Sequence, residues 1–240
     1  MVEQWKKDFR EDYQRLPELR SLATGAPWAL FSATLEAKAM HSLITDLDLA
    51  EPRVIKGLFT RPNIFLDVKI FDADGHAELL QPVIADLLEN KGAASKTLAY
   101  TGKDLAAELT VLVGAAIGQF SARTDGHKRV DFFLASSSAE LKIDVRDDFM
   151  LANSKTRFLF ATNALGMGLN ILALYCVMDI DFVRNLADWC QEFGRAGRDG
   201  RPARAILCIS SMRNKAECLK LFVNAFKQKA LPAHGHSASL

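Results

Sequence analysis

The sequence RFLFATNALGMGLN occupies residues 157–170 and decides how the segments around it are interpreted. It opens with a short apolar run, which is typical of a strand buried on both faces. Thr162 and Asn163 follow this run, and Gly166 and Gly168 space the loop that comes next. A hydroxyl, exposed backbone donors and glycines at a strand end suit a phosphate or a sugar-phosphate backbone. The same residues also suit an ordinary turn whose apolar side chains belong to the core.

The segments on either side repeat the pattern of a short apolar strand followed by an amphipathic helix. We expect strands at residues 64–71, 96–100, 157–161, 174–180 and 203–209, and helices at residues 76–88, 103–117, 140–151, 184–193 and 213–227. This alternation predicts the α/β class, with a doubly wound parallel sheet covered by helices on both faces. Ligands of such sheets bind at the loops beyond the carboxyl ends of the strands.

The first sixty residues have a different organisation. A polar helical start leads to a short apolar strand at residues 28–31 and then to a helix whose apolar side chains run from Met40 to Leu47. A connector with a proline near each end follows. We therefore expect four parts, at residues 1–50, 51–62, 63–212 and 213–240, the last being a helix and a disordered tail.

Composition limits the function only loosely. The 240 residues are 49% hydrophobic and carry a formal net charge of +1, so a nucleic-acid surface would have to be a local patch. The sequence contains no apolar run of membrane-spanning length and no signal-peptide core, so we expect an intracellular protein that is not secreted and has no membrane partner. The four cysteines form no Cys-x-x-Cys pair, which argues against a disulfide framework and against zinc.

The most informative stretch is QEFGRAGRDG, at residues 191–200. Arg195 and Arg198 stand between glycines, in a pattern that suits a tight loop beside a helix. A guanidinium group is planar and always charged, and it binds phosphate oxygens through two parallel hydrogen bonds. The pattern therefore indicates a polyphosphate ligand, although a short Gly/Arg-rich loop is in many proteins a solvated turn.

The decamer closely resembles motif VI of the RecQ-like helicases. Residues 158–170 resemble motif V of that family, and the Ala-Leu-Gly-Met-Gly run at residues 164–168 is especially similar to its fungal branches. The two segments occur in the family's order. DEAD-box RNA helicases are less similar, because their motif VI opens with His-Arg where this chain has Gln191 and Glu192. The resemblance implies a RecA-like second motor domain preceded by the end of the first, and an ancestral reaction of ATP-driven 3′-to-5′ unwinding of duplex DNA.

The resemblance also implies roles for individual residues. Arg195 and Arg198, with Gln191 beside them, would contact the γ-phosphate of ATP bound in a neighbouring domain. The residues that would couple the nucleotide to DNA are Ser32, Thr34, Gly166, Gly168 and Asn170, and those that would contact DNA are Trp5, Phe9, Arg10, Thr162 and Asn163. The Ser-Ala-Thr segment at residues 32–34 is also typical of a helix N-cap.

The aromatic segment near the N-terminus matches the family's aromatic-rich loop. Aromatic rings such as those of Trp5 and Phe9 stack on unpaired bases, and Arg10 adds a phosphate or cation–π contact. An amphipathic helix with an aromatic face is the alternative interpretation. The chain departs from the family at Lys6 and Lys7, where the family has Gly-His.

Two further segments have a family interpretation and a plainer one. Arg61-Pro62-Asn63 is similar to the start of the family's second motor domain, and it also suits a turn fixed by proline. Arg123, Lys128 and Arg129 form a basic cluster that could touch DNA phosphates or could begin a solvated helix.

A helicase motor needs a phosphate cradle of the form Gly-x-x-x-x-Gly-Lys-Ser/Thr and an acidic box that holds Mg²⁺. The sequence contains neither. We therefore expect a truncated RecQ-like helicase that is inactive alone and uses ATP and Mg²⁺ only when the missing first motor domain is supplied. Its partners would be single-stranded or forked DNA, and an intact helicase or the missing motor half, in the nucleus if the source is eukaryotic. The alternative is a non-catalytic nucleic-acid-binding or helicase-interacting module.

Overall fold

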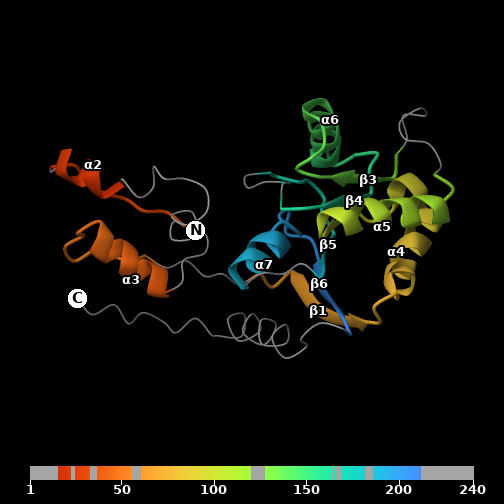
Figure 1. Cartoon of the computed structure of the whole chain (residues 1–240), viewed down its shortest axis with the longest axis horizontal. Coiled ribbons are helices and arrows are strands. Elements are labelled where there is room, and N and C mark those ends of the chain that lie inside the picture. The colour runs from red at the N-terminus through yellow and green to blue at the C-terminus, as the bar shows by residue number, and fades with distance from the viewer. Residues whose placement is uncertain are drawn as a thin grey trace. The chain divides into compact units, whose positions relative to one another are not determined.

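The computed structural model describes residues 16–22, 25–32, 37–55, 61–119, 128–163, 165, 169–181 and 186–211. The elements that these residues form are labelled in Figure 1. The chain divides into two compact units, Met1–Leu58 and Phe59–Leu240. The helix and tail predicted after residue 212 lie outside the described residues.

The described part of the first unit is helical. It forms α2 (Leu16–Leu22) and α3 (Ala37–Asp46), and the predicted apolar residues Leu43 and Leu47 are buried. The strand predicted at residues 28–31 is wrong, because this segment has no regular structure. A strand needs a neighbour for its backbone hydrogen bonds, and no other strand occurs among the described residues of this unit. The side chain of Phe31 is 93% exposed.

The second unit is built on a parallel sheet with the strand order β1-β6-β5-β2-β4-β3. Its strands are β1 (Ile64–Phe71), β2 (Thr97–Tyr100), β3 (Val130–Phe133), β4 (Phe158–Ala161), β5 (Cys176–Ile180) and β6 (Ala203–Ser210). Every residue of β2, β4 and β5 is buried. Short strands rich in apolar residues become central for this reason, since both of their faces are removed from water.

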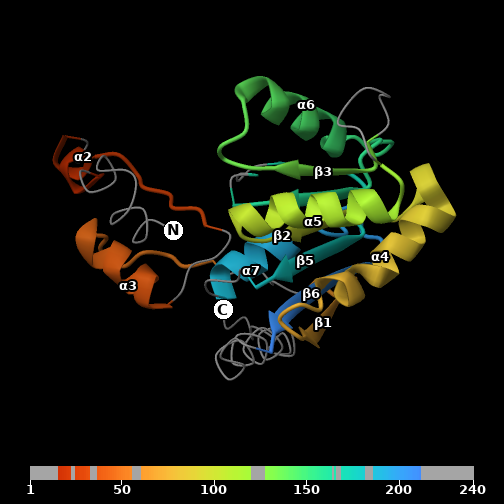
Figure 2. The ribbon, with the colours of Figure 1, turned by 45° about the vertical axis from the view of Figure 1, so that its right-hand side comes forward.

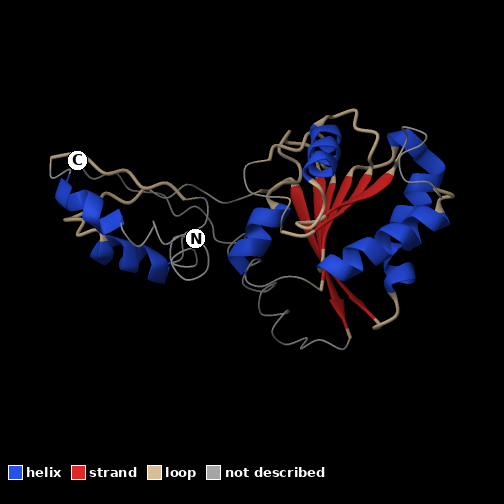
Figure 3. Ribbon diagram, turned by 45° about the horizontal axis from the view of Figure 1, so that its top comes forward, coloured by secondary structure: helices blue, strands red, loops and turns tan. Residues whose placement is uncertain are grey.

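Helices cover both faces of the sheet, as Figure 2 and Figure 3 show from two directions. They are α4 (His76–Asn90), the short η2 (Lys91–Ala93), α5 (Lys103–Ala116), α6 (Ala139–Met150) and α7 (Leu186–Phe193). Leu109 of α5 packs in one core with Ala99 of β2, whereas Phe149 of α6 packs in a second core with the adjacent Leu98. None of the helices in the described part of the chain has the length and apolar character needed to cross a membrane.

This architecture confirms the predicted α/β class and the doubly wound parallel sheet. The strand β3 was not predicted, because it has only four residues and one of them is Asp131. It forms through parallel pairing with β4 and lies against α5 and α6. Its pairing partner β4 follows only after α6, so the pattern within β3 itself gives little sign of the strand.

Candidate functional site

The predicted polyphosphate-binding arginines lie on a loop between α7 and β6. We call residues 194–201 the arginine loop. Its backbone is anchored where the amide of Gly197 donates to the carbonyl of Leu174 at 2.9 Å, and it turns where the amide of Gly200 donates to the carbonyl of Gly197 at 3.1 Å. Gly197 has a φ of +56° and Gly200 a φ of +82°. Glycine adopts this left-handed conformation without steric cost, which explains two of the glycines in the decamer.

Arg195 and Arg198 have different surroundings. Arg195 is buried, at 8% exposure, whereas Arg198 is exposed. The guanidinium of Arg198 donates from Nη1 to the carbonyl of Leu169 at 2.9 Å and to Oδ1 of Asn170 at 3.4 Å. The structure therefore brings together Arg198 and Asn170, which the sequence had placed in two different motifs.

A positive cluster surrounds this contact. Partial burial of its guanidinium lowers the pKa of Arg198, and the nearby guanidinium groups of Arg195 and Arg61 lower it further. Among the described residues, no carboxylate lies within ion-pair distance of Arg198 or Arg61. Guanidinium groups held close together favour an anionic ligand such as a phosphate.

A residue that sequence reasoning did not place in the site holds the arginine loop. The guanidinium of Arg61 donates from Nη1 to the carbonyl of Gly194 at 3.0 Å, and from Nη2 to the carbonyls of Ala196 at 2.7 Å and Gly197 at 2.9 Å. Arg61 and Gly194 are 133 residues apart in sequence. The only sign of this contact in the sequence was the resemblance of the Arg-Pro-Asn segment to the start of a second motor domain.

Asn63 completes the attachment. Its side-chain amide donates to the carbonyls of Gly197 and Arg201, both at 2.8 Å. Its own carbonyl accepts from the amide of Ala203 at 2.8 Å, at the start of β6. The Arg-Pro-Asn segment is therefore tied to the arginine loop at both ends, which is more than the simple turn that was the alternative interpretation.

Buried acidic residues lie close to Arg195. Asp179 of β5 has no solvent exposure, and Glu192 of α7 is 8% exposed. Burial raises the pKa of Asp179 well above its usual range, and the neighbouring Glu192 raises it further. Burial also raises the pKa of Tyr100, which lies near the same groups. Nothing in the sequence pattern marked Asp179, because β5 otherwise reads as an apolar strand.

The replacement Asp179→Asn is expected to stabilise the protein. The pKa of Asp179 is higher in the folded chain than in the unfolded chain, so folding takes up a proton at pH values between the two. The free energy of unfolding of the wild type therefore falls as the pH rises from the unfolded pKa to the folded pKa. Asparagine carries no such proton, so the variant should be more stable than wild type by about 1 kcal/mol or more at neutral pH. Urea unfolding at about pH 5 and about pH 8 should show that the difference in free energy of unfolding between variant and wild type is larger at the higher pH. A variant less stable than wild type at both pH values would contradict the raised pKa of Asp179.

The other predicted residues are partly placed. Thr162 follows β4, where its amide donates to the carbonyl of Phe133 at 3.2 Å, and Asn163 is exposed beside it. Gln191 lies half-buried in the last turn of α7, and Ser32 is an exposed residue of the first unit. The remaining residues lie outside the described part of the chain: Trp5, Phe9, Arg10, Thr34, Gly166 and Gly168.

The two described residues of the basic cluster, Lys128 and Arg129, bond to other groups of the fold. Arg129 donates to the carbonyls of Leu87 at 2.6 Å and Ile117 at 3.2 Å. Lys128 pairs with Asp131 at 3.2 Å. These two residues precede β3 rather than a helix, so the solvated helix start is wrong, whereas Arg123 lies outside the described residues.

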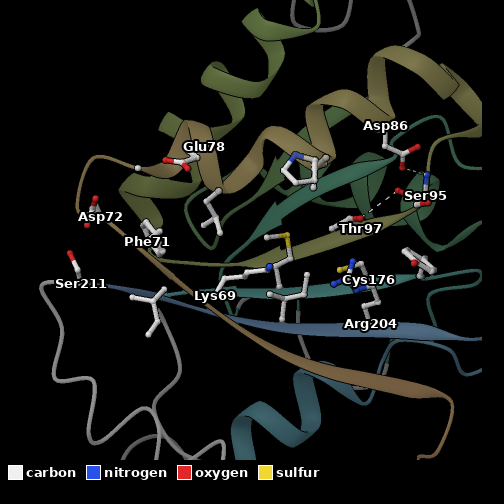
Figure 4. Close-up of a pocket in the computed structure, with 18 residues that line it drawn as sticks. Lys69, Phe71, Asp72, Glu78, Asp86, Ser95, Thr97, Cys176, Arg204 and Ser211 are labelled. Atoms are coloured by element: carbon white, nitrogen blue, oxygen red, sulfur yellow. Dashed lines mark hydrogen bonds between the residues drawn. The ribbon is translucent and has the colours of Figure 1, made fainter.

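A cavity of about 610 Å³ lies on the α4 side of the sheet, and Figure 4 shows its lining. Its lining includes Lys69 from β1, Arg204 from β6 and Cys176 from β5. Burial raises the pKa of Cys176 to about 12, so this thiol stays protonated. None of the predicted site residues lines this cavity, so its size gives no reason to move the candidate site away from the arginine loop.

Comparison with known proteins agrees with this geometry. Residues 84–200 match the family model described as the helicase conserved C-terminal domain. The chain is 29% identical over 209 residues to the ATP-dependent DNA helicase hus2/rqh1 of Schizosaccharomyces pombe, covering 87% of this chain and 14% of that protein. It is also 29% identical to the probable ATP-dependent DNA helicase RecS of Bacillus subtilis, covering 86% of this chain and 38% of that protein. The chain thus spans well under half the length of these relatives.

The fold has solved relatives as well. Saccharomyces cerevisiae Dbp5, in a structure bound to RNA and ADP BeF3, superposes with a TM-score of 0.60 at 15% identity, over 84% of this chain and 48% of that one. At this identity the likeness concerns the fold alone, and it agrees with a RecA-like sheet. The chain therefore contains a helicase C-terminal domain at residues 84–200, and over most of its length its sequence is similar to RecQ-like DNA helicases.

Proposed function

We propose that this chain supplies the second motor half of an ATP-dependent DNA helicase. Residues 63–212 would form the second RecA-like motor domain, residues 1–50 the end of the first, and residues 51–62 the connector, with residues 213–240 as an appended helix and tail. ATP and Mg²⁺ would be held mainly by a first motor domain, and the DNA substrate would be single-stranded or forked. The names of the relatives, which describe ATP-dependent DNA helicases, support this proposal.

The observation that carries the proposal is the contact between the two motifs at Arg198. This guanidinium belongs to a positive cluster and also donates to Leu169 and Asn170. A phosphate that attracts Arg198 would compete with these two acceptors, so nucleotide binding would alter the loop that ends at Asn170. In this scheme Arg195 and Arg198 stabilise charge on the phosphates, Gln191 assists them, and Thr162, Asn163 and the aromatic segment of Trp5 contact DNA. An arginine that completes a phosphoryl-transfer site contributes only on top of a positioned Mg²⁺ and nucleotide.

The replacement Arg198→Ala should weaken binding of inorganic tripolyphosphate about tenfold, since a charge-assisted contact at an exposed site contributes on the order of 1–2 kcal/mol. Isothermal titration calorimetry of the purified chain at low ionic strength measures this. The matched control is Arg146→Ala, which removes the same charge from an exposed position where Arg146 pairs with Asp147 at 2.8 Å. It should change the affinity by less than about twofold. Equal losses in both variants would mean that net charge alone attracts the anion, which contradicts a site.

The same proteins are then assayed for ATP hydrolysis with and without single-stranded DNA. No turnover is expected, because this sequence contains neither the phosphate cradle nor the acidic box. Turnover that disappears in Arg198→Ala would reveal a nucleotide site within the chain. It would overturn the proposal that a first motor domain holds ATP and Mg²⁺.

A non-catalytic role is the second candidate, and the missing cradle and acidic box favour it. The chain would then bind single-stranded nucleic acid, or associate with an intact helicase and alter its activity. Binding through phosphate contacts weakens steeply with salt, whereas association through an apolar protein surface does not. Fluorescence anisotropy with labelled single-stranded DNA over a range of salt concentrations distinguishes the two modes.

A further inference from the structure

The attachment of the arginine loop depends on one side chain that precedes the sheet. Arg61 lies directly before β1, and its two terminal nitrogens reach three carbonyl oxygens of the loop, at 2.7–3.0 Å. The amide of Asn63 adds two more hydrogen bonds at 2.8 Å. We call these two side chains the clamp. Together they give the loop five hydrogen bonds from a segment that is remote in sequence.

The acceptors are the carbonyls that flank the functional arginines. Arg61 binds the carbonyls of Gly194 and Ala196, which bracket Arg195 in the chain. The clamp also converges on the carbonyl of Gly197, which accepts from both side chains and precedes Arg198. The backbone positions from which both guanidinium groups project are therefore held from outside the loop.

Gly197 has a second reason to be glycine at this contact. A Cβ added there would lie 2.5 Å from the Asn63 side-chain nitrogen and 2.8 Å from the Arg201 carbonyl oxygen. The clamp can approach the loop this closely only because residue 197 has no side chain. The glycine spacing of the decamer thus serves contact with the clamp as well as the turn itself.

We propose that Arg61 and Asn63 are positioning residues that hold the arginine loop in the geometry in which Arg195 and Arg198 receive a phosphate chain. The proposal rests on the function proposed above for these arginines. A preorganised loop binds an anion more tightly, because less conformational entropy is lost when the ligand arrives. The charge of Arg61 acts in the same direction, since it adds to the positive cluster around Arg198.

The geometry distinguishes arginine from lysine at position 61. The guanidinium of Arg61 reaches the three carbonyls from two nitrogens held in a fixed plane, whereas an ammonium group presents its donors from a single nitrogen and cannot occupy both positions. Arg61→Lys therefore keeps the charge and removes the clamp. If Arg61 acted only through its charge, the lysine variant would behave like the wild type.

Hydrogen exchange measures the clamp directly. In Arg61→Lys and Asn63→Ala, the amides of residues 197 and 200 should exchange about tenfold faster than in wild type, since local opening of the loop becomes easier. The amides of β4 at residues 158–161 should keep their wild-type rates, and they report whether the whole unit has been destabilised. Unchanged rates at residues 197 and 200 in Arg61→Lys would overturn the proposal. Equal acceleration in the loop and in β4 would also overturn it, because it indicates a general structural role.

Binding completes the test. Both variants should bind inorganic tripolyphosphate about fivefold to tenfold more weakly, at a nearly unchanged midpoint of thermal unfolding. The control is Arg146→Lys, which should have no effect on exchange in the loop or on affinity. A faster-exchanging loop with unchanged affinity would overturn the positioning role. If wild type binds no more tightly than Arg198→Ala, the proposed function of the arginines fails, and the exchange rates still decide whether the clamp exists.

Discussion

Gly197→Ala is expected to lower the free energy of unfolding of the second unit by about 2–5 kcal/mol. The left-handed φ of +56° costs about 1–2 kcal/mol for a residue with a Cβ. The added carbon would also lie at 2.5 Å, 2.8 Å and 2.9 Å from atoms of Asn63, Arg201 and Ala203. Relieving such crowding typically costs a further 1–3 kcal/mol, roughly, in shifted backbone and side chains. Urea unfolding followed by circular dichroism measures the difference.

Gly200→Ala is the matched control in the same loop. Its φ of +82° is also left-handed, but nothing lies within 4 Å of an added Cβ. The free energy of unfolding of this variant should therefore fall only by the cost of a left-handed φ for a residue with a Cβ, about 1–2 kcal/mol. The difference between the two variants measures the crowding of an added Cβ at residue 197 by Asn63, Arg201 and Ala203. Equal losses would show that Gly197 is required for its conformation alone.

Lys96→Met is expected to be the more damaging change, at about 3–5 kcal/mol. Lys96 is 1% exposed, and its ammonium group donates to the carbonyls of Phe149 at 2.7 Å and Leu172 at 3.1 Å, and also to that of Leu151. Burial lowers the pKa of Lys96 to about 8, with a smaller effect from Arg157. The ammonium form still predominates at neutral pH, so all three protons have acceptors. Methionine fills a similar volume but donates to none of the three carbonyls, of which, within the described part of the chain, only that of Leu151 keeps another donor, the amide of Ser154 at 3.2 Å.

Lys142→Met is the control for this prediction. Lys142 donates to the carbonyl of Ala135 at 2.7 Å, but at an exposed position where water can replace it. Its replacement should change stability by no more than about 0.5–1 kcal/mol. Chemical denaturation of both variants beside wild type gives the comparison. Similar losses would indicate that the burial of Lys96 adds nothing to its contribution.

Lys96 also shows where sequence reasoning stopped. It was identified only as the start of a strand at residues 96–100, and the strand itself is confirmed as β2. Its three acceptors lie at the end of α6 and in the segment before β5, and are 53 to 76 residues away in sequence. A buried lysine gives no periodic signal by itself. Its role becomes visible only when the carbonyls that it serves are brought together.

The candidate site shows the same division. The motifs around Thr162 and Arg195 were recognised from local patterns of apolar residues, glycines and arginines, and the family that they indicate is confirmed. The individual roles of Arg195, Arg198, Gln191 and the coupling residues remain predictions. The clamp was missed, since the Arg-Pro-Asn segment has no chemistry of its own until it meets the arginine loop.

The sequence by itself determined the alternation of strands and helices, the parallel sheet and the decamer, because each depends on residues that are neighbours along the chain. Only the tertiary structure decided that β3 forms, that residues 28–31 do not make a strand, and that Arg61, Asn170 and Arg198 meet at one loop. Each of these outcomes depends on a partner remote in sequence. A buried polar or charged group needs a partner, and folding decides which groups, distant along the chain, come close enough to be that partner.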